Sequence, residues 1–234
     1  MNTEKNMNNI EIIPAIMPNS YNDLLEKSGQ VSDVVSIVQI DVMDGIFVPE
    51  KTWPYVDSAD EHFARMINEE EGLPNAEKID YELDLMIQSP DTDFDKWVAL
   101  QPRRIIVHIE SLENPENFFA KVQPLRDIIQ IGVSLNNDTD ISVIQPYLGQ
   151  VDFVQCMGIA RIGYQGESFD ERVLETILNI KKIAPDMVVS VDGAVNAETA
   201  KKLVDAGAIR LVSGSAIFGG ENVEEGIARL RKSI

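Results

Sequence analysis

The chain is poor in cysteine and in long apolar runs. Its single cysteine, Cys156, cannot form a disulfide within the chain. No apolar run approaches the roughly 18 residues that a membrane-spanning helix needs. Residues 1–9 are polar and lack the apolar segment of a signal peptide, so we expect them to form a tail. These absences predict a cytoplasmic protein that does not enter a membrane.

Basic residues are also scarce. The 234 residues include 20 Lys and Arg against 39 Asp and Glu, which gives a formal net charge of −19. Nucleic acids and anionic membrane surfaces are both bound through an excess of cations on one face of a protein. The charge therefore argues against nucleic acid and against a membrane surface as partners.

Short apolar, β-branched runs alternate with amphipathic stretches along most of the chain. We expect eight strands, at residues 11–17, 36–43, 81–87, 104–109, 128–135, 151–157, 187–191 and 209–213. Most are nearly continuous apolar runs, as is typical of parallel strands covered on both faces. Eight strand-then-helix units without a break in composition predict an α/β fold, a single (β/α)8 TIM barrel over residues 10–234.

Local signals indicate where several helices begin and end. Ser89-Pro90 and Asn114-Pro115 each place a capping side chain before a proline suited to the first helical turn. Gly207 follows an amphipathic stretch and predicts a helix end. Residues 56–80 are irregular and acidic, and we expect a helix followed by a solvent-exposed excursion there.

Carboxylates occur where the apolar strands end. In (β/α)8 barrels this end of the strands carries the active site. Asp41 and Asp84 alternate with apolar residues, and Asp192 ends the seventh strand, so we expect all three to point into the barrel mouth. Asp41 and Asp192 would then face each other as acid and base for proton transfer next to a carbonyl group. The alternative is that these aspartates only cap loops or helices.

Glycines after two strands are candidates for phosphate binding. Gly214-Ser215 follows the eighth strand directly, where backbone N–H groups at a short helix start can hold an anion. Gly163 and Gly166, after the sixth strand, would close over the anion. Ordinary turns are the alternative interpretation of both segments.

Four segments together resemble the ribulose-phosphate 3-epimerase family: residues 40–49 (IDVMDGIFVP), 84–86 (DLM), 191–193 (VDG) and 213–219 (SGSAIFG). The resemblance runs in order from about residue 12 to the C-terminus. It implies a homo-oligomeric barrel that interconverts the phosphorylated ketoses ribulose 5-phosphate and xylulose 5-phosphate. It also implies proton transfer by Asp41 and Asp192 through an enediolate, aided by a divalent metal. The matching substrate-binding positions are Met43, Met86, His108, Met157, Gly193 and Ala194, besides the glycines and Ser215 named above.

The sequence departs from this family at the metal site. The family uses two histidines and two aspartates, and the positions of its histidines hold Gln39 and Asp84. A set of Gln39, Asp41, Asp84 and Asp192 offers only oxygen ligands, which favours Mg²⁺, Mn²⁺ or Ca²⁺ over Zn²⁺. A protein without metal is the alternative, and three close carboxylates would then keep a proton at neutral pH.

These departures leave three hypotheses for the function. The first is a pentulose 5-phosphate 3-epimerase. The second is another phosphoketose isomerase or lyase on the same barrel, motivated by the changes at Gln39 and Asp84. The third is a barrel that binds a phosphorylated metabolite without catalysis.

Overall fold

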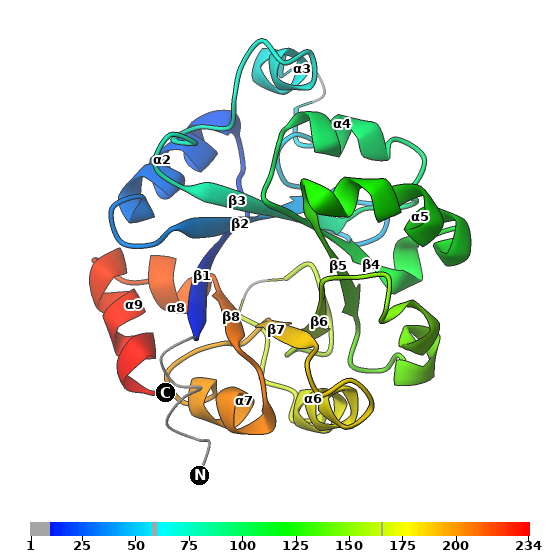
Figure 1. Ribbon diagram of the computed structural model, residues 1–234. Coiled ribbons are helices and arrows are strands. Elements are labelled where there is room, and N and C mark those ends of the chain that lie inside the picture. Colours follow the sequence, from blue (N-terminus) through cyan, green and yellow to red (C-terminus); the bar gives the residue numbers. More distant parts are fainter. Residues whose placement is uncertain (1–9, 58–59, 165) are drawn as a thin grey trace.

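Eight parallel strands pair in sequence order, and the first pairs with the last to close a barrel (Figure 1). The computed structural model describes residues 10–57, 60–164 and 166–234. The strands are β1 Glu11–Ile16, β2 Ile37–Met43, β3 Asp80–Met86, β4 Arg104–His108, β5 Gln130–Leu135, β6 Phe153–Met157, β7 Val188–Asp192 and β8 Arg210–Ser213. All eight predicted strands are confirmed to within two residues at each end, and so is the single (β/α)8 barrel.

Helices lie outside the barrel and cover its strands (Figure 1). They are α2 Tyr21–Val31, α3 Glu61–Ile67, α4 Phe94–Ala99, α5 Pro115–Val122, α6 Arg172–Ile183, α7 Ala200–Ala206, α8 Ser215–Phe218 and α9 Val223–Lys232. The connection from β5 to β6 holds two 3-10 turns, Ile141–Val143 and Gln145–Tyr147, instead of an α-helix. Within the described ranges, no helix combines the length and the apolar character needed to cross a membrane.

Two of the three predicted helix boundaries are confirmed. Asn114 accepts a hydrogen bond from the backbone N–H of Asn117 at the start of α5, and Gly207 ends α7 with a φ of 117°. The helix start at Ser89-Pro90 is wrong, because α4 begins at Phe94. Ser89 has a φ of 49°, which is incompatible with the extended backbone typical of a cap, and its hydroxyl bonds Glu113 instead.

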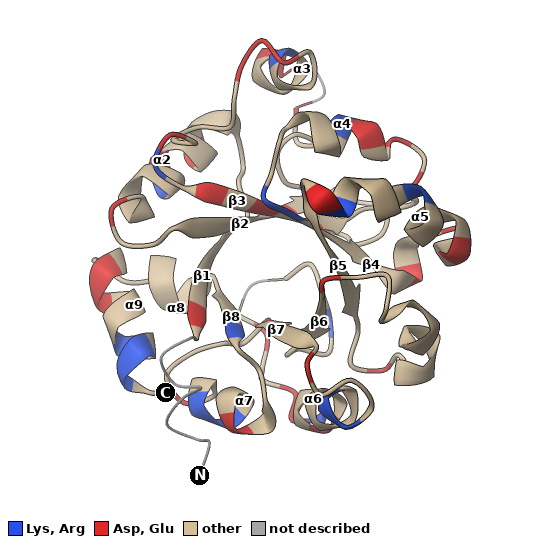
Figure 2. Cartoon of the chain, in the orientation of Figure 1, with Lys and Arg blue, Asp and Glu red and all other residues tan. Residues whose placement is uncertain are grey.

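The acidic segment between β2 and β3 carries α3 and lies against α2. Asp60 caps α3 by accepting a hydrogen bond from the backbone N–H of Phe63. The ring of His62 stacks on Tyr21 with 3.7 Å between centroids, and the Tyr21 hydroxyl donates to Glu71. Figure 2 shows acidic residues around this helix. The segment therefore has ordered contacts with the barrel although it is rich in like charges.

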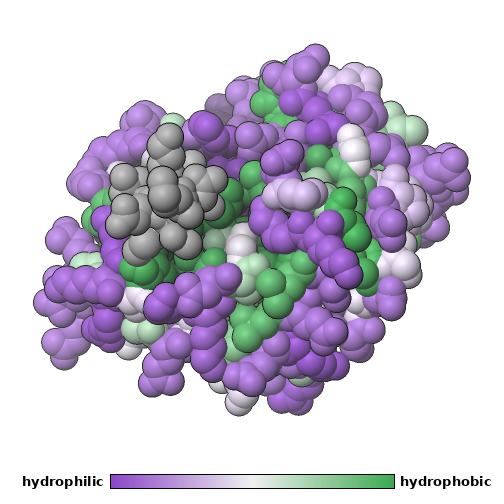
Figure 3. All heavy atoms as spheres, turned by 60° about the horizontal axis from the view of Figure 1, so that its bottom comes forward, coloured by the Kyte–Doolittle hydropathy of each residue, from purple (hydrophilic) through white to green (hydrophobic). Residues whose placement is uncertain are grey.

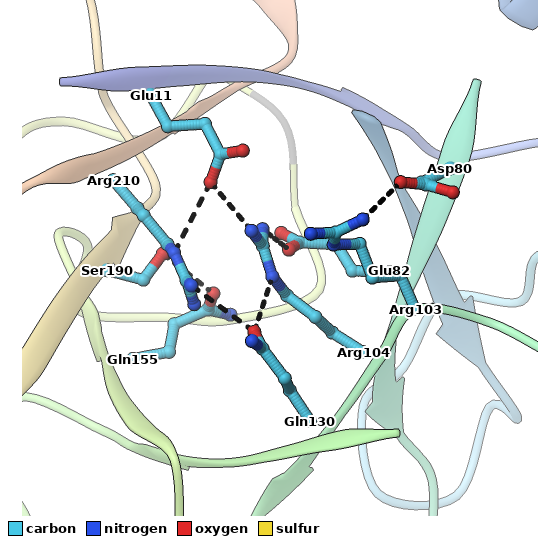
Figure 4. A network of polar contacts seen from close by, with 9 residues as sticks. All are labelled: Glu11, Asp80, Glu82, Arg103, Arg104, Gln130, Gln155, Ser190 and Arg210. Carbon is cyan, nitrogen blue, oxygen red and sulfur yellow. Dashed lines mark hydrogen bonds and ion pairs between the residues drawn. The ribbon is translucent and has the colours of Figure 1, made fainter. Parts of the chain in front are cut away.

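A network of charged side chains closes the N-terminal end of the barrel (Figure 4). Arg104 donates to Glu82 at 2.9 Å, to Glu11 at 2.9 Å and to Gln130 at 3.1 Å. Arg210 lies 3.3 Å from both Glu11 and Gln130. Arg104, Gln130, Arg210 and Glu11 each begin their strands, so their inward-pointing side chains meet at one level. Residues at this end of a TIM barrel serve stability rather than catalysis.

An aromatic ring fills the barrel next to this network. A Cβ atom at Gly132 would come within 2.4 Å of the ring of Phe153, so the glycine makes room for the ring. The guanidinium of Arg210 lies 4.6 Å from the centre of the same ring.

The outer surface turned forward in Figure 3 is mostly hydrophilic, with smaller apolar areas between the polar side chains.

Candidate active site

A cavity of about 240 Å³ lies at the C-terminal ends of the strands. Most of the predicted site residues line it: Asp41, Met43, Met86, Met157, Gly163, Gly166, Asp192, Gly193, Ala194, Gly214 and Ser215. Gln39, Asp84 and His108 do not line the cavity; all three are completely buried inside the barrel. The site thus has an open layer that a ligand can reach and a buried polar layer that supports it.

Three carboxylates converge in these two layers. One oxygen from each of Asp41, Asp84 and Asp192 lies within 4.8 Å of the others. Asp41 and Asp84 are directly paired in the register of β2 and β3, and Asp192 comes from β7. The side-chain alternation of β2 puts Gln39 on the same inward face as Asp41. The predicted convergence of these aspartates is therefore present.

Gln39 joins two of these carboxylates through one amide nitrogen. Its Nε2 donates to Asp41 Oδ1 at 2.7 Å and to Asp192 Oδ2 at 2.8 Å. Both N–H bonds of the amide are thus used on carboxylates, which makes them charge-assisted. Its carbonyl oxygen, Oε1, is buried and has no hydrogen-bond partner.

Burial and mutual repulsion change the acidity of the two aspartates. Burial and the neighbouring charge of Asp192 raise the pKa of Asp41 well above its ordinary value. Burial and the charge of Asp84 raise the pKa of Asp192 to about 7. Both carboxyl groups therefore keep their protons to a higher pH than an exposed aspartate does.

Asp84 is held by two further side chains. His108 Nε2 lies 3.1 Å from Asp84 Oδ1, and Gln155 Nε2 donates to Oδ2 at 3.0 Å. The Ser190 hydroxyl donates to the Oε1 of Gln155 at 3.3 Å. Burial lowers the pKa of His108, but the charge and hydrogen bond of Asp84 outweigh this and raise it overall. Asp84 and His108 are therefore held together as a buried, hydrogen-bonded pair inside the barrel.

Sequence reasoning missed Gln155 and Thr52. Gln155 is a polar residue within an otherwise apolar strand, which is a usable signal, although its partner Asp84 is visible only in the fold. Thr52 accepts a hydrogen bond from the Met43 N–H at 2.8 Å and donates to the Asp41 carbonyl at 2.6 Å. No local pattern marks Thr52, because its role depends on the path of the loop after β2.

Asp44, which follows β2, caps a loop. Its Oδ1 accepts from the backbone N–H groups of Ile46 and Phe47, and its Oδ2 accepts from that of Gln88. These bonds order the connection after β2 and join it to the segment after β3. Asp44 therefore supports the cavity rim and is absent from the cavity lining.

The far end of the cavity is built from closely spaced backbone. A Cβ atom at Gly158 would lie 2.2 Å from the carbonyl oxygen of Gly193, so the segments directly after β6 and β7 approach each other very closely. Gly193 has a φ of 96° and Ala194 has a φ of 53°. Ala194 thus keeps a left-handed backbone that normally favours glycine. Ser213 donates its hydroxyl to the Val195 carbonyl and fixes this segment beside α8.

The donor set at the three carboxylates fits a hard divalent cation. Asp41, Asp84 and Asp192 supply carboxylate oxygens, which Mg²⁺, Mn²⁺ and Ca²⁺ prefer. The amide nitrogen of Gln39 cannot ligate a metal ion, whereas the unpartnered Oε1 can. Turning the amide over would therefore supply a fourth oxygen ligand.

Comparison with known proteins decides the family. The family model described as the ribulose-phosphate 3 epimerase family matches residues 11–218. The chain belongs to this family. Ribulose-phosphate 3-epimerase from Bacillus subtilis is 29% identical over 235 residues, covering 96% of this chain and 99% of that protein. The enzyme of the same name from Aquifex aeolicus is 30% identical and covers 83% of each chain. The resemblance stated from the motifs is confirmed.

Solved structures support the fold independently. The 3-hexulose-6-phosphate synthase from Salmonella typhimurium aligns over 96% of this chain and 98% of its own, with a TM-score of 0.66 and 13% identity. The 3-keto-L-gulonate-6-phosphate decarboxylase from Vibrio cholerae aligns over 96% of both chains, with a TM-score of 0.66 and 12% identity. At these identities the likeness bears on the barrel fold alone.

Proposed function

We propose that this member of the family is a pentulose 5-phosphate 3-epimerase that interconverts ribulose 5-phosphate and xylulose 5-phosphate. The observation that carries the proposal is the pair of cavity carboxylates, Asp41 and Asp192, which accept hydrogen bonds from one amide nitrogen and whose pKa values are both raised. Epimerisation at a carbon next to a carbonyl needs one basic and one acidic group, which such a pair supplies.

The proton balance of the reaction follows from this pair. The ionised aspartate takes the proton from C3, and the electron pair of the broken C–H bond moves into an enediolate. The protonated aspartate then gives its proton to C3 from the opposite face. After one turnover the two carboxyl groups have exchanged their protonation states. The reverse reaction, or proton exchange with solvent, restores the starting state.

Gln39, Asp41, Asp84 and Asp192 would hold a hard divalent cation such as Mg²⁺ or Mn²⁺. When bound, such an ion stabilises the negative charge on the enediolate oxygens. The contact between His108 and Asp84 would orient the Asp84 carboxylate from inside the barrel.

The phosphate would lie at the end of the cavity near α8. Gly193, Ala194, Gly214 and Ser215 line the cavity and would supply backbone N–H groups to the anion, and Gly163 and Gly166 of the loop after β6 line the same cavity. Because the chain carries a net charge of −19, the anion must be held by such local groups against an unfavourable overall field. Met43, Met86 and Met157 supply the apolar wall against which the sugar would pack.

The test is isotope exchange with ribulose 5-phosphate in D₂O, in the presence of Mg²⁺ or Mn²⁺. We expect deuterium at C3 and formation of xylulose 5-phosphate. Asp41→Asn and Asp192→Asn should each abolish both signals, whereas Asp33→Asn, a change in an exposed surface ion pair, should leave them intact. Absence of exchange in the unmodified protein with every metal would refute the proposal.

The same exchange assay, repeated with other phosphorylated ketoses, separates the other two hypotheses. Turnover confined to a different phosphoketose would favour another isomerase or lyase, a reading motivated by Gln39 and Asp84. Binding of a phosphorylated sugar without turnover would favour a non-catalytic barrel. A homo-oligomeric state, a cytoplasmic location and the absence of nucleic acid or membrane partners stay predictions, and light scattering after gel filtration tests the first.

A further inference from the structure

The buried amide of Gln39 has an unequal environment at its two ends. Gln39 is completely buried, and its nitrogen donates to both Asp41 and Asp192. Its carbonyl oxygen has no partner, although a buried amide oxygen normally accepts a hydrogen bond. The orientation of the amide is therefore fixed by the two carboxylates, whose oxygens accept hydrogen bonds from its N–H groups.

The opposite orientation depends on a cation. If the amide turned over without one while both carboxylates were ionised, Oε1 would face two carboxylate oxygens at the distances now held by the nitrogen, 2.7 and 2.8 Å, and would repel them. With a divalent cation among the carboxylates, the N–H bonds would instead point at positive charge. The cation thus reverses which end of the amide is favoured.

We propose that Gln39 is an amide switch. In the cation-free protein its NH₂ group joins Asp41 to Asp192, and when a hard divalent cation binds among Asp41, Asp84 and Asp192 the amide turns over and Oε1 becomes a ligand. This inference rests on the cation site of the proposed function and does not depend on which sugar phosphate is turned over.

Two features of the site allow such a switch without unfolding. Asp84 is held by His108 and Gln155, so one carboxylate stays in position whichever way the amide points. Asp41 is fixed at its carbonyl by Thr52. The switch consequently needs rotation about the terminal torsion of one side chain, which has broad, roughly two-fold preferences.

Two variants separate the roles of the two amide ends. Gln39→Glu keeps the shape but replaces the bridging nitrogen with a second oxygen, so the cation-free protein contains four close carboxylates. Gln39→Met is of similar length and removes both the bridge and the carbonyl ligand. Gln130→Glu is the matched control, because it makes the same amide-to-carboxylate change inside the barrel but next to Arg104 and Arg210.

The first measurement is Mn²⁺ affinity by calorimetry, together with melting temperatures in EDTA and in Mn²⁺. Both Gln39 variants should melt lower than the unmodified protein in EDTA. Gln39→Glu should bind Mn²⁺ about tenfold or more tightly, and Gln39→Met about tenfold or more weakly, in line with typical effects at metal sites. Gln130→Glu should leave the Mn²⁺ affinity unchanged. Mn²⁺ binding by Gln39→Met as tight as that of the unmodified protein, or tighter, would overturn the switch.

The second measurement uses only the unmodified protein and holds even if the variants fail to fold. In the nuclear magnetic resonance spectrum of ¹⁵N-labelled protein, the side-chain amide protons of Gln39 should lie downfield in EDTA, as expected for bonds to carboxylates. Saturating Mg²⁺ should move them upfield and speed their exchange. Unmoved amide protons at saturating Mg²⁺, or no binding of Mg²⁺ or Mn²⁺, would overturn the inference. Exchange with ribulose 5-phosphate, measured on the same samples in EDTA and in Mg²⁺, reports separately on the proposed function.

Discussion

Removal of the Arg104 guanidinium should strongly destabilise the barrel without changing its chemistry. The side chain of Arg104 is 5% exposed and that of Glu82 is 1% exposed, and the two are joined at 2.9 Å. Breaking such a buried pair by removing one partner typically lowers the free energy of unfolding by about 3–5 kcal/mol. For a chain of this size each kcal/mol shifts the melting temperature by about 2–4 °C. Arg104→Met should therefore melt about 6–20 °C lower.

The loss should depend on pH. Burial raises the pKa of Glu82, and the charge and hydrogen bond of Arg104 oppose this effect. Without Arg104, burial is opposed only by the charge of Arg210, so the pKa of Glu82 should rise further. A carboxyl group whose pKa is higher in the folded than in the unfolded protein reduces stability as pH rises above its unfolded value, near 4.3. Arg104→Met should therefore lose more stability at pH 8 than at pH 5.

The assay is thermal and urea unfolding of Arg104→Met at both pH values. Arg103→Met is the matched control. Arg103 pairs with Asp80, both side chains are about half exposed, and such an exposed pair contributes about 0–1 kcal/mol to the free energy of unfolding. Adding Glu82→Gln to Arg104→Met should recover part of the loss, since no buried charge is then left alone. A loss below about 1 kcal/mol at pH 8, or an equal loss at both pH values, would show that Glu82 does not depend on Arg104 for its charge compensation.

Three further predictions concern the cavity end of the barrel. In EDTA, the raised pKa values of Asp41 and Asp192 should reduce stability as pH rises from about 4 to 7. Asp192→Asn should make the melting temperature depend less on pH over this range. Ala194→Gly should leave the free energy of unfolding unchanged or raise it by up to about 1 kcal/mol, because relief of the left-handed backbone offsets the added freedom of the unfolded chain. A lower free energy of unfolding for Ala194→Gly would contradict this expectation. Epimerisation should be lost in EDTA and restored better by Mg²⁺ or Mn²⁺ than by Zn²⁺; full restoration by Zn²⁺ alone would count against an all-oxygen site.

The strands were predictable because their apolar runs are bounded by polar residues and because parallel strands need no partner-specific pattern. The inward direction of Asp41 and Asp192 follows from strand alternation and also needs no knowledge of tertiary structure. Ser89 illustrates the opposite case. A serine before a proline is a pattern typical of a helix start. In the structure, however, the backbone at Ser89 is left-handed and its hydroxyl donates to Glu113, which belongs to a segment distant in the sequence.

The same limit explains the polar layer behind the cavity. The sequence marks Gln39 and Asp84 as unusual only by comparison with a family pattern. Their partners, Asp192, His108 and Gln155, come from three other strands, so pairing depends on the register around the closed barrel. Propensity and periodicity report the direction of each side chain along its own strand, and they carry no information on which side chain it meets across the barrel axis.

The charges inside the barrel are balanced at one end and unbalanced at the other. At the N-terminal end, Glu11 and Glu82 face Arg104 and Arg210, so two acids meet two bases. Near the cavity, the three carboxylates described above face the single imidazole of His108, which leaves a surplus of negative charge where a phosphorylated sugar would enter. An anion can bind there only if this surplus is reduced by proton uptake or by a cation. Otherwise the negative charges of the carboxylates and of the bound anion would repel each other in a buried site. Substrate affinity should accordingly weaken as pH rises above about 7 in EDTA, and this dependence should diminish in saturating Mg²⁺.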